Sequence, residues 1–236
     1  MFKNIIFGLF VLLFSLDAKA FSLSDVLHNL FSRSHTSSNN DNNGVVKNIL
    51  SQTDGLDPKV LNLALNAYQK LHQEGYDYQQ MLTIVDYTKP STEPRLWVLD
   101  LKTLQVKFHE LVAHAKNSGG NFPTEFSDNP RSLQSSIGVF LTSNTYYGEH
   151  GYSLKLNGLE QGFNDKARAR SIVMHPAEYV SETFARIHGR LGRSWGCFAV
   201  NPAVSQEIIS NIKDGTVLFA YYPDARWLSH SRYISA

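Results

Sequence analysis

The residues with the clearest chemical potential lie at positions 187–198. They combine three glycines and two arginines with Cys197, the single cysteine of the 236-residue chain. Glycines allow a backbone to adopt positive φ and to approach another molecule closely. A tight loop formed by Ser194, Trp195 and Gly196 can present the thiol beside amide groups, and such amides can hold the oxyanion that forms when a thiolate attacks a carbonyl. Cys197 is therefore a candidate nucleophile, with a buried structural thiol as the alternative.

A cysteine nucleophile needs a base, because an ordinary thiol titrates near ~8.5 and is mostly protonated at neutral pH. His175 ends the β-prone run at residues 171–174, and His188 stands nine positions before the thiol. A side chain at the end of a strand is held rigidly, which favours His175 as the base. His188 is the alternative base, or else a residue that orients the loop or the substrate.

The remaining histidines do not predict a metal site. His109, His114 and His150 lack the helical or hairpin spacing with an acidic partner that ligand sets show. We therefore expect neither a metal nor a cofactor.

Aromatic and basic residues elsewhere suggest weaker roles. Tyr146, Tyr147 and Tyr152 are candidates for the wall of a groove that holds an extended peptide. Arg168 and Arg170 are expected on a solvated, charged face.

The elements that must position these residues are mostly short strands. Seven runs rich in Val, Ile, Leu and aromatic residues, separated by turn residues, predict strands. They are residues 82–87, 95–101, 106–113, 137–142, 153–156, 171–174 and 216–222. Apolar residues at helical spacing predict one helix from Asp57 to Gly75, and a second helix is expected at 202–213 with Asn201 as its cap. The prediction is a mainly β, α+β fold, a sandwich or barrel with an N-terminal helix and a helix after the candidate catalytic loop.

The N-terminal segments predict export. Lys3, an apolar stretch and Ala18-Lys19-Ala20 are typical of a signal peptide, which we place at residues 1–20. Residues 21–54 are expected to be a flexible linker, most clearly in the Ser- and Asn-rich part at 32–44, and residues 55–80 a helical segment. The mature protein would then be periplasmic or secreted, without a membrane span.

Composition excludes some partners. Hydrophobic residues make up 42% of the chain and charged residues 18%, as in ordinary globular proteins. A net charge of +1 gives no overall field that would favour nucleic acid, so we expect none as a partner.

Several passages together resemble the YkuD-type murein L,D-transpeptidases. The strand-borne His175 and the Ser-Trp-Gly-Cys run at 194–197 are similar to the family's signature, and the passages at 95–101, 134–138 and 145–148 strengthen the likeness. The resemblance covers about residues 82–222. It implies a catalytic domain at 81–236 with a YkuD-like fold.

This resemblance also implies a reaction. A cysteine attacks the carbonyl of meso-diaminopimelate, the diamino acid of a peptidoglycan stem tetrapeptide, releases the terminal D-alanine and forms a thioester, which a second stem amine or water resolves. It assigns Cys197 as nucleophile, His175 as base, and Ser194 as the residue that holds the loop. Arg190 or Arg193 would meet a substrate carboxylate, with Tyr147 as a further substrate-binding residue.

Two alternatives to the transferase remain. One is an L,D-carboxypeptidase or endopeptidase with the same thiol chemistry, and the other is a non-catalytic domain that binds the cell wall. The sequence leaves the oligomeric state open.

Overall fold

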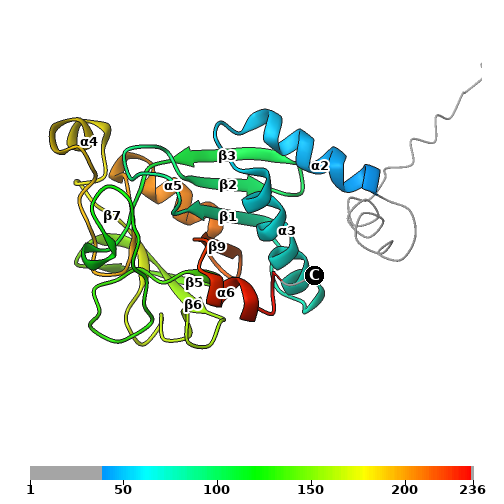
Figure 1. Cartoon of the computed structure of the whole chain (residues 1–236). Helices are drawn as coiled ribbons and strands as arrows, with labels where there is room; N and C mark the ends of the chain where they lie inside the picture. The colour runs from blue at the N-terminus through cyan, green and yellow to red at the C-terminus, as the bar shows by residue number, and fades with distance from the viewer. Residues whose placement is uncertain (1–38, 235–236) are drawn as a thin grey trace, which may run out of the picture. The chain divides into compact units, whose positions relative to one another are not determined.

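Nine strands form one sheet in the order β3-β2-β1-β9-β5-β6-β7-β8-β4. The structure is a computed structural model that describes residues 39–234, with side chains from residue 44 (Figure 1). The strands are β1 (Met81–Asp86), β2 (Leu96–Asp100), β3 (Gln105–Glu110), β4 (Val112–Ala113), β5 (Gly138–Gly148), β6 (Gly151–Gly158), β7 (Val173–Pro176), β8 (Phe198–Val200) and β9 (Val217–Tyr221).

The sheet is curled like a barrel because its two edge strands are neighbours in the chain. Leu111 alone separates β3 from β4, yet these strands occupy opposite ends of the sheet order. A chain this short cannot cross a flat nine-stranded sheet, so the sheet bends until its edges approach one another. Strands β1 and β9 are parallel, as are β7 and β8, and the other neighbours are antiparallel. The predicted mainly β fold is confirmed.

Two helices form where the capping residues predict them. Helix α3 (Pro58–Gln73) begins after Asp57, whose side chain accepts a hydrogen bond from the Lys59 amide. Helix α5 (Pro202–Ile212) begins after Asn201, whose side chain accepts from the Ala203 amide. A proline in the first turn of each helix already has the required φ.

Further helices are α2 (Asn39–Gln52), α4 (Glu182–His188) and α6 (Ala225–His230). Helix α2 lies within the segment that the sequence analysis reads as a linker, so from residue 39 that prediction is corrected. Its Ile49 is buried in the same core as α3, and such tertiary packing stabilises a helix whose composition alone does not reveal it. The predicted signal peptide and the first part of the linker lie outside the described residues.

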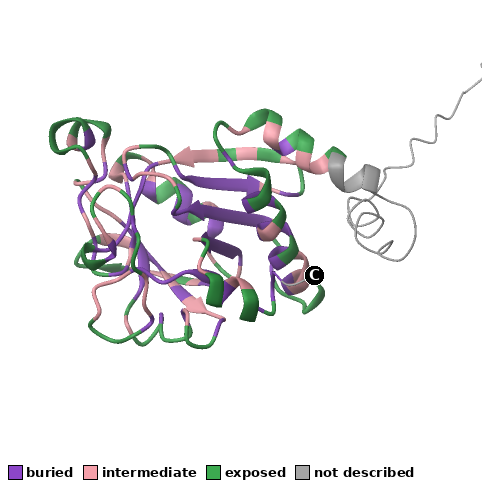
Figure 2. Cartoon of the chain, viewed as in Figure 1, coloured by how far each residue is buried: buried purple, intermediate pink, exposed green. Residues whose placement is uncertain are grey.

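The core lies between the sheet and the helices. Strands β1 and β9 are buried along their whole length, whereas the residues of β3 are exposed or half-buried (Figure 2). Leu61 and Leu71 of α3 join Phe219 of β9 in one apolar cluster, so α3 braces the sheet. Among the described residues, no helix has the length and apolar character needed to cross a membrane.

Candidate active site

One pocket of about 600 Å³ brings the candidate nucleophile and the candidate base together. Its walls come from the β5–β6 hairpin, from β7 with the segment before it, and from the loop before β8. The lining residues are Tyr146, Glu149, His150, Arg170, Ser171, Ile172, Val173, His175, Tyr179, Arg193, Ser194, Trp195 and Cys197. Segments up to fifty residues apart in the chain therefore meet around the thiol.

His175 is fixed in one tautomer by the backbone. It is buried on β7, and its Nδ1 lies 2.8 Å from the carbonyl oxygen of Pro176. A carbonyl only accepts, so Nδ1 carries the proton and Nε2 is left as the acceptor. Burial, with a smaller contribution from His150, lowers the pKa of His175, against the raising effect of the Pro176 hydrogen bond. The ring is thus neutral at neutral pH and able to take a proton.

Cys197 is half-buried immediately before β8, and its Sγ donates to the Ser171 carbonyl oxygen at 3.6 Å. Burial raises the pKa of this thiol above its ordinary value, although the Val173 amide and the Arg170 charge act in the opposite direction. A thiol that is ionised at rest would need a lowered pKa, whereas at Cys197 desolvation outweighs the nearby charge. At rest the pair is a neutral thiol and a neutral imidazole.

Ser194 shapes the loop that carries the thiol. Its Oγ donates to the Cys197 carbonyl oxygen at 2.7 Å and accepts from the Gly196 amide at 3.2 Å. Gly196 has φ +141°, and a Cβ there would collide with Ile172. The Gly196 amide is therefore occupied, whereas no hydrogen bond from the Trp195 or Cys197 amide is found within residues 39–234. These two amides are the better candidates for oxyanion donors.

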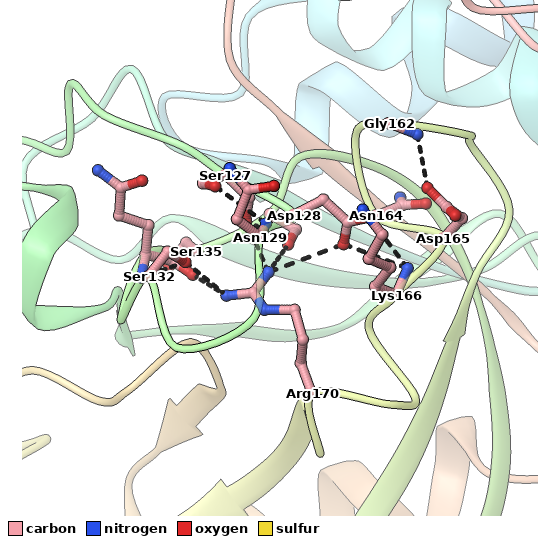
Figure 3. A network of polar contacts seen from close by, with 12 residues as sticks. Ser127, Asp128, Asn129, Ser132, Ser135, Gly162, Asn164, Asp165, Lys166 and Arg170 are labelled. Atoms are coloured by element: carbon pink, nitrogen blue, oxygen red, sulfur yellow. Dashed lines mark hydrogen bonds and ion pairs between the residues drawn. The ribbon is translucent and has the colours of Figure 1, made fainter.

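Arg170 is a structural residue, which corrects its predicted place on a solvated face (Figure 3). Its side chain is only 4% exposed and lies 3.8 Å from the Asp128 carboxylate. The guanidinium also donates to the carbonyl oxygens of Ser127 and Gln134, at 2.6 Å each. It therefore ties residues 127–136 to the floor of the pocket, while Arg168 is exposed as predicted.

A second buried arginine is linked through His114 to the loop that carries Cys197. Arg95 is fully buried and donates to the Val112 carbonyl oxygen, and its Nη2 lies 2.8 Å from His114 Nδ1. Burial and the Arg95 charge lower the pKa of His114 to about 3, so His114 is neutral. The His114 carbonyl oxygen accepts from the Ser194 amide at 3.0 Å. The sequence analysis missed this pair, whose members lie 19 residues apart and meet only in the folded sheet.

Not every predicted site residue lies in the pocket. Arg193 lines it, and its Nη1 donates to the Lys116 and Gly119 carbonyl oxygens. His188, the alternative base, is exposed at the end of α4, where its ring packs at a tilt against Phe184 with centroids 4.2 Å apart.

Two predicted substrate-binding residues also lie outside it. Arg190 donates to the carbonyl oxygen of Leu191, and Tyr147 is 80% exposed and packs on Tyr152. Neither is among the lining residues, whereas the neighbouring Tyr146 is. In the part of the chain that the structure describes, no group of three or more His, Cys, Asp or Glu residues could hold a metal ion.

The sequence profile of a family described as the L,D-transpeptidase catalytic domain matches residues 52–221. This match spans most of the chain, including the pocket and both candidate catalytic residues. The chain therefore belongs to the L,D-transpeptidase catalytic domain family. The comparison with curated proteins finds no match.

Solved structures give remote likenesses. An L,D-transpeptidase from Mycobacterium smegmatis is 11% identical, with 61% of this chain and 59% of that one covered and a TM-score of 0.38. An L,D-transpeptidase from Stackebrandtia nassauensis is 12% identical, with 85% and 89% covered and a TM-score of 0.37. One from Enterococcus faecium is 11% identical, with 60% and 50% covered and a TM-score of 0.37. The chain thus spans only about half to three-fifths of the first and third of these proteins, and family membership rests on the profile match.

Proposed function

We propose that this protein is an exported cysteine L,D-transpeptidase that acts on peptidoglycan stem peptides through a thioester. The observation that carries the proposal is the shared pocket of Cys197 and His175, in which the Pro176 carbonyl leaves Nε2 of the imidazole free to accept a proton. Export rests on the signal peptide predicted from the sequence. Family membership supplies the reaction class.

The neutral resting pair favours a general-base mechanism. As Cys197 Sγ attacks the carbonyl carbon of the diamino acid in the stem, His175 Nε2 takes the thiol proton. The Trp195 and Cys197 amides would stabilise the negative charge that develops on the carbonyl oxygen. When the C–N bond breaks, His175 returns the proton to the departing D-alanine amine, and the acyl group remains on sulfur.

The second half of the reaction reverses these roles. An amine of another stem peptide attacks the thioester carbon, His175 takes a proton from that amine, and the C–S bond breaks. The sulfur leaves as a thiolate and recovers its proton from the imidazolium. Water in place of the amine would give a carboxypeptidase.

Incubation of the protein with purified muropeptides tests this function. We expect new cross-linked dimers together with free D-alanine, and neither product from the Cys197→Ala variant. Shortened stems without dimers would assign the hydrolase. Unchanged peptides that are retained by the protein would assign the wall-binding domain and overturn the enzymatic proposal.

A further inference from the structure

The tip of the β5–β6 hairpin places an acidic side chain in the thiol pocket. Gly148 pairs with Gly151, so Glu149 and His150 form a two-residue turn between the strands. The His150 ring stacks on His175 with centroids 4.5 Å apart, which fixes the tip beside the candidate base. Glu149 lines the same pocket.

Glu149 is the single acidic residue among the described lining residues, and it has no internal partner. No ion pair to its carboxylate is found within residues 39–234. The two arginines of the pocket are engaged elsewhere, since Arg170 bonds to the 127–136 segment and Arg193 to backbone carbonyls. A carboxylate that lines the same pocket as the thiol, with no cation assigned to it, fits a ligand that brings its own cation.

We propose that Glu149 binds the side-chain ammonium of the diamino acid in the stem peptide. The inference rests on the proposed function, because that function supplies a substrate in which an amino group stands a few bonds from the reacting carbonyl. An ammonium is a compact point charge with several donors, so one carboxylate in a partly open pocket can recognise it without a planar partner. Glu149 is then a specificity-determining residue that requires a free amine on the substrate.

Peptide binding in a Cys197→Ala background tests this role without the need for turnover. Calorimetry would compare a tetrapeptide stem whose side-chain amine is free with the same peptide acetylated at that amine. Glu149→Gln should weaken binding of the free-amine peptide about tenfold, as expected when a charge-assisted hydrogen bond is lost. It should change binding of the acetylated peptide by less than about twofold. Equal effects on the two peptides, or no effect on either, would overturn the assignment.

Glu207→Gln is the matched control, because Glu207 is an exposed residue of α5 that does not line the pocket. It removes the same charge and should leave both affinities unchanged. A tripeptide that ends at the diamino acid has no D-alanine to lose, so it can serve only as acceptor. Loss of affinity for the tripeptide alone would place the ammonium site on the acceptor side, and loss for the tetrapeptide alone would place it on the donor side.

The proposed function is tested separately by release of D-alanine from the free-amine tetrapeptide by the protein with Cys197 intact. If no D-alanine appears while Glu149→Gln still erases the preference for the free amine, the catalytic proposal fails and the recognition site stands. If D-alanine appears and Glu149→Gln leaves that preference intact, the recognition site fails and the catalytic proposal stands.

Discussion

The neutral state of Cys197 and His175 decides which chemistry the site favours. A pre-formed thiolate–imidazolium pair needs a thiol of lowered pKa, whereas burial raises the pKa of Cys197 and lowers that of His175. Both shifts favour the uncharged forms. In the mechanism that we propose, proton transfer accompanies attack on the substrate, and the position of His175 Nε2 matters more than the acidity of the thiol.

Replacement of each candidate base should separate their roles. We expect His175→Ala to lower kcat for D-alanine release by about 10²–10⁴-fold, the usual contribution of general base catalysis. His188→Ala should change kcat by less than about twofold, since His188 lies outside the pocket. Steady-state kinetics on a tetrapeptide would measure both variants. A large loss in His188→Ala with an intact His175→Ala would reverse the assignment.

Alkylation of Cys197 should reveal its raised pKa. The rate of reaction with iodoacetamide depends on the thiolate fraction, so it should rise with pH and reach its midpoint above that of free cysteine, near ~8.5. At pH 7 the protein should therefore react more slowly than an unstructured cysteine peptide. A midpoint below that of the peptide would show a pre-formed ion pair and contradict the general-base mechanism.

The sequence singles out Cys197 and His175 because the thiol is unique and the histidine ends an apolar run, and the structure places both in one pocket, while their catalytic roles stay a prediction. Glu149, Arg170 and the Arg95–His114 pair could not be predicted, since their roles arise from contacts between distant segments. In the sequence Arg170 resembles a surface charge. Only the folded structure shows that it bonds to residues 127–136 (Figure 3).

Among the elements, the loop before β8 depends on close packing as well as on the Ser194 hydrogen bonds. A Cβ at Gly192 would lie 2.5 Å from Tyr179 Cδ2 and still closer to Cβ and Cγ of that side chain. Tyr179 lines the pocket, so displacement of its ring would reshape the site. The small size of Gly192 thus allows the Tyr179 side chain to hold its position in the pocket wall.

Gly192→Ala should therefore destabilise the protein by about 1–3 kcal/mol, the usual cost of overpacking, and should lower turnover. Gly120→Ala is the control, because a Cβ at Gly120 meets nothing within 4 Å. Urea unfolding and D-alanine release would be measured for both variants. Equal stability of the two would show that Tyr179 moves aside without cost.

Element prediction from the sequence succeeds where a cap marks the boundary. Asp57 and Asn201 precede α3 and α5 as predicted. Helices α4 and α6 are not predicted from the sequence because they have only 7 and 6 residues, too few to show a periodic pattern. The three-residue strand β8, which directly follows Cys197, is not predicted for the same reason.

At the scale of the whole molecule, a buried carboxyl makes stability depend on pH. Asp77 is 4% exposed, its Oδ2 has no hydrogen-bond partner within residues 39–234, and burial raises its pKa to about 6. The folded state therefore binds this proton more tightly than the unfolded chain does. The stability that the proton supplies is present below about pH 4 and is lost as pH rises through about 6.

Asp77→Asn should remove that dependence, because the amide does not titrate. From about pH 4 to pH 6 the Asp77 contribution to the unfolding free energy should fall by about 2 kcal/mol in the parent protein. It should be absent in the variant. Asp54→Asn, at an exposed position, is the control and should follow the parent. Chemical denaturation at several pH values would measure the difference, and parallel curves for Asp77→Asn and the parent would refute the assignment.

The one-residue connection at Leu111 has a further consequence. Strand β4 pairs with β8, and two positions beyond β4 the backbone of Ala115 bridges to Ser194. The segment that closes the sheet is therefore joined by backbone pairing to both sides of Cys197, at β8 and at Ser194. An inserted residue at Leu111 would change the reach of β4 and shift the sulfur relative to the imidazole, with every lining side chain unaltered. We therefore expect turnover, as well as folding, to depend on the length of this connection.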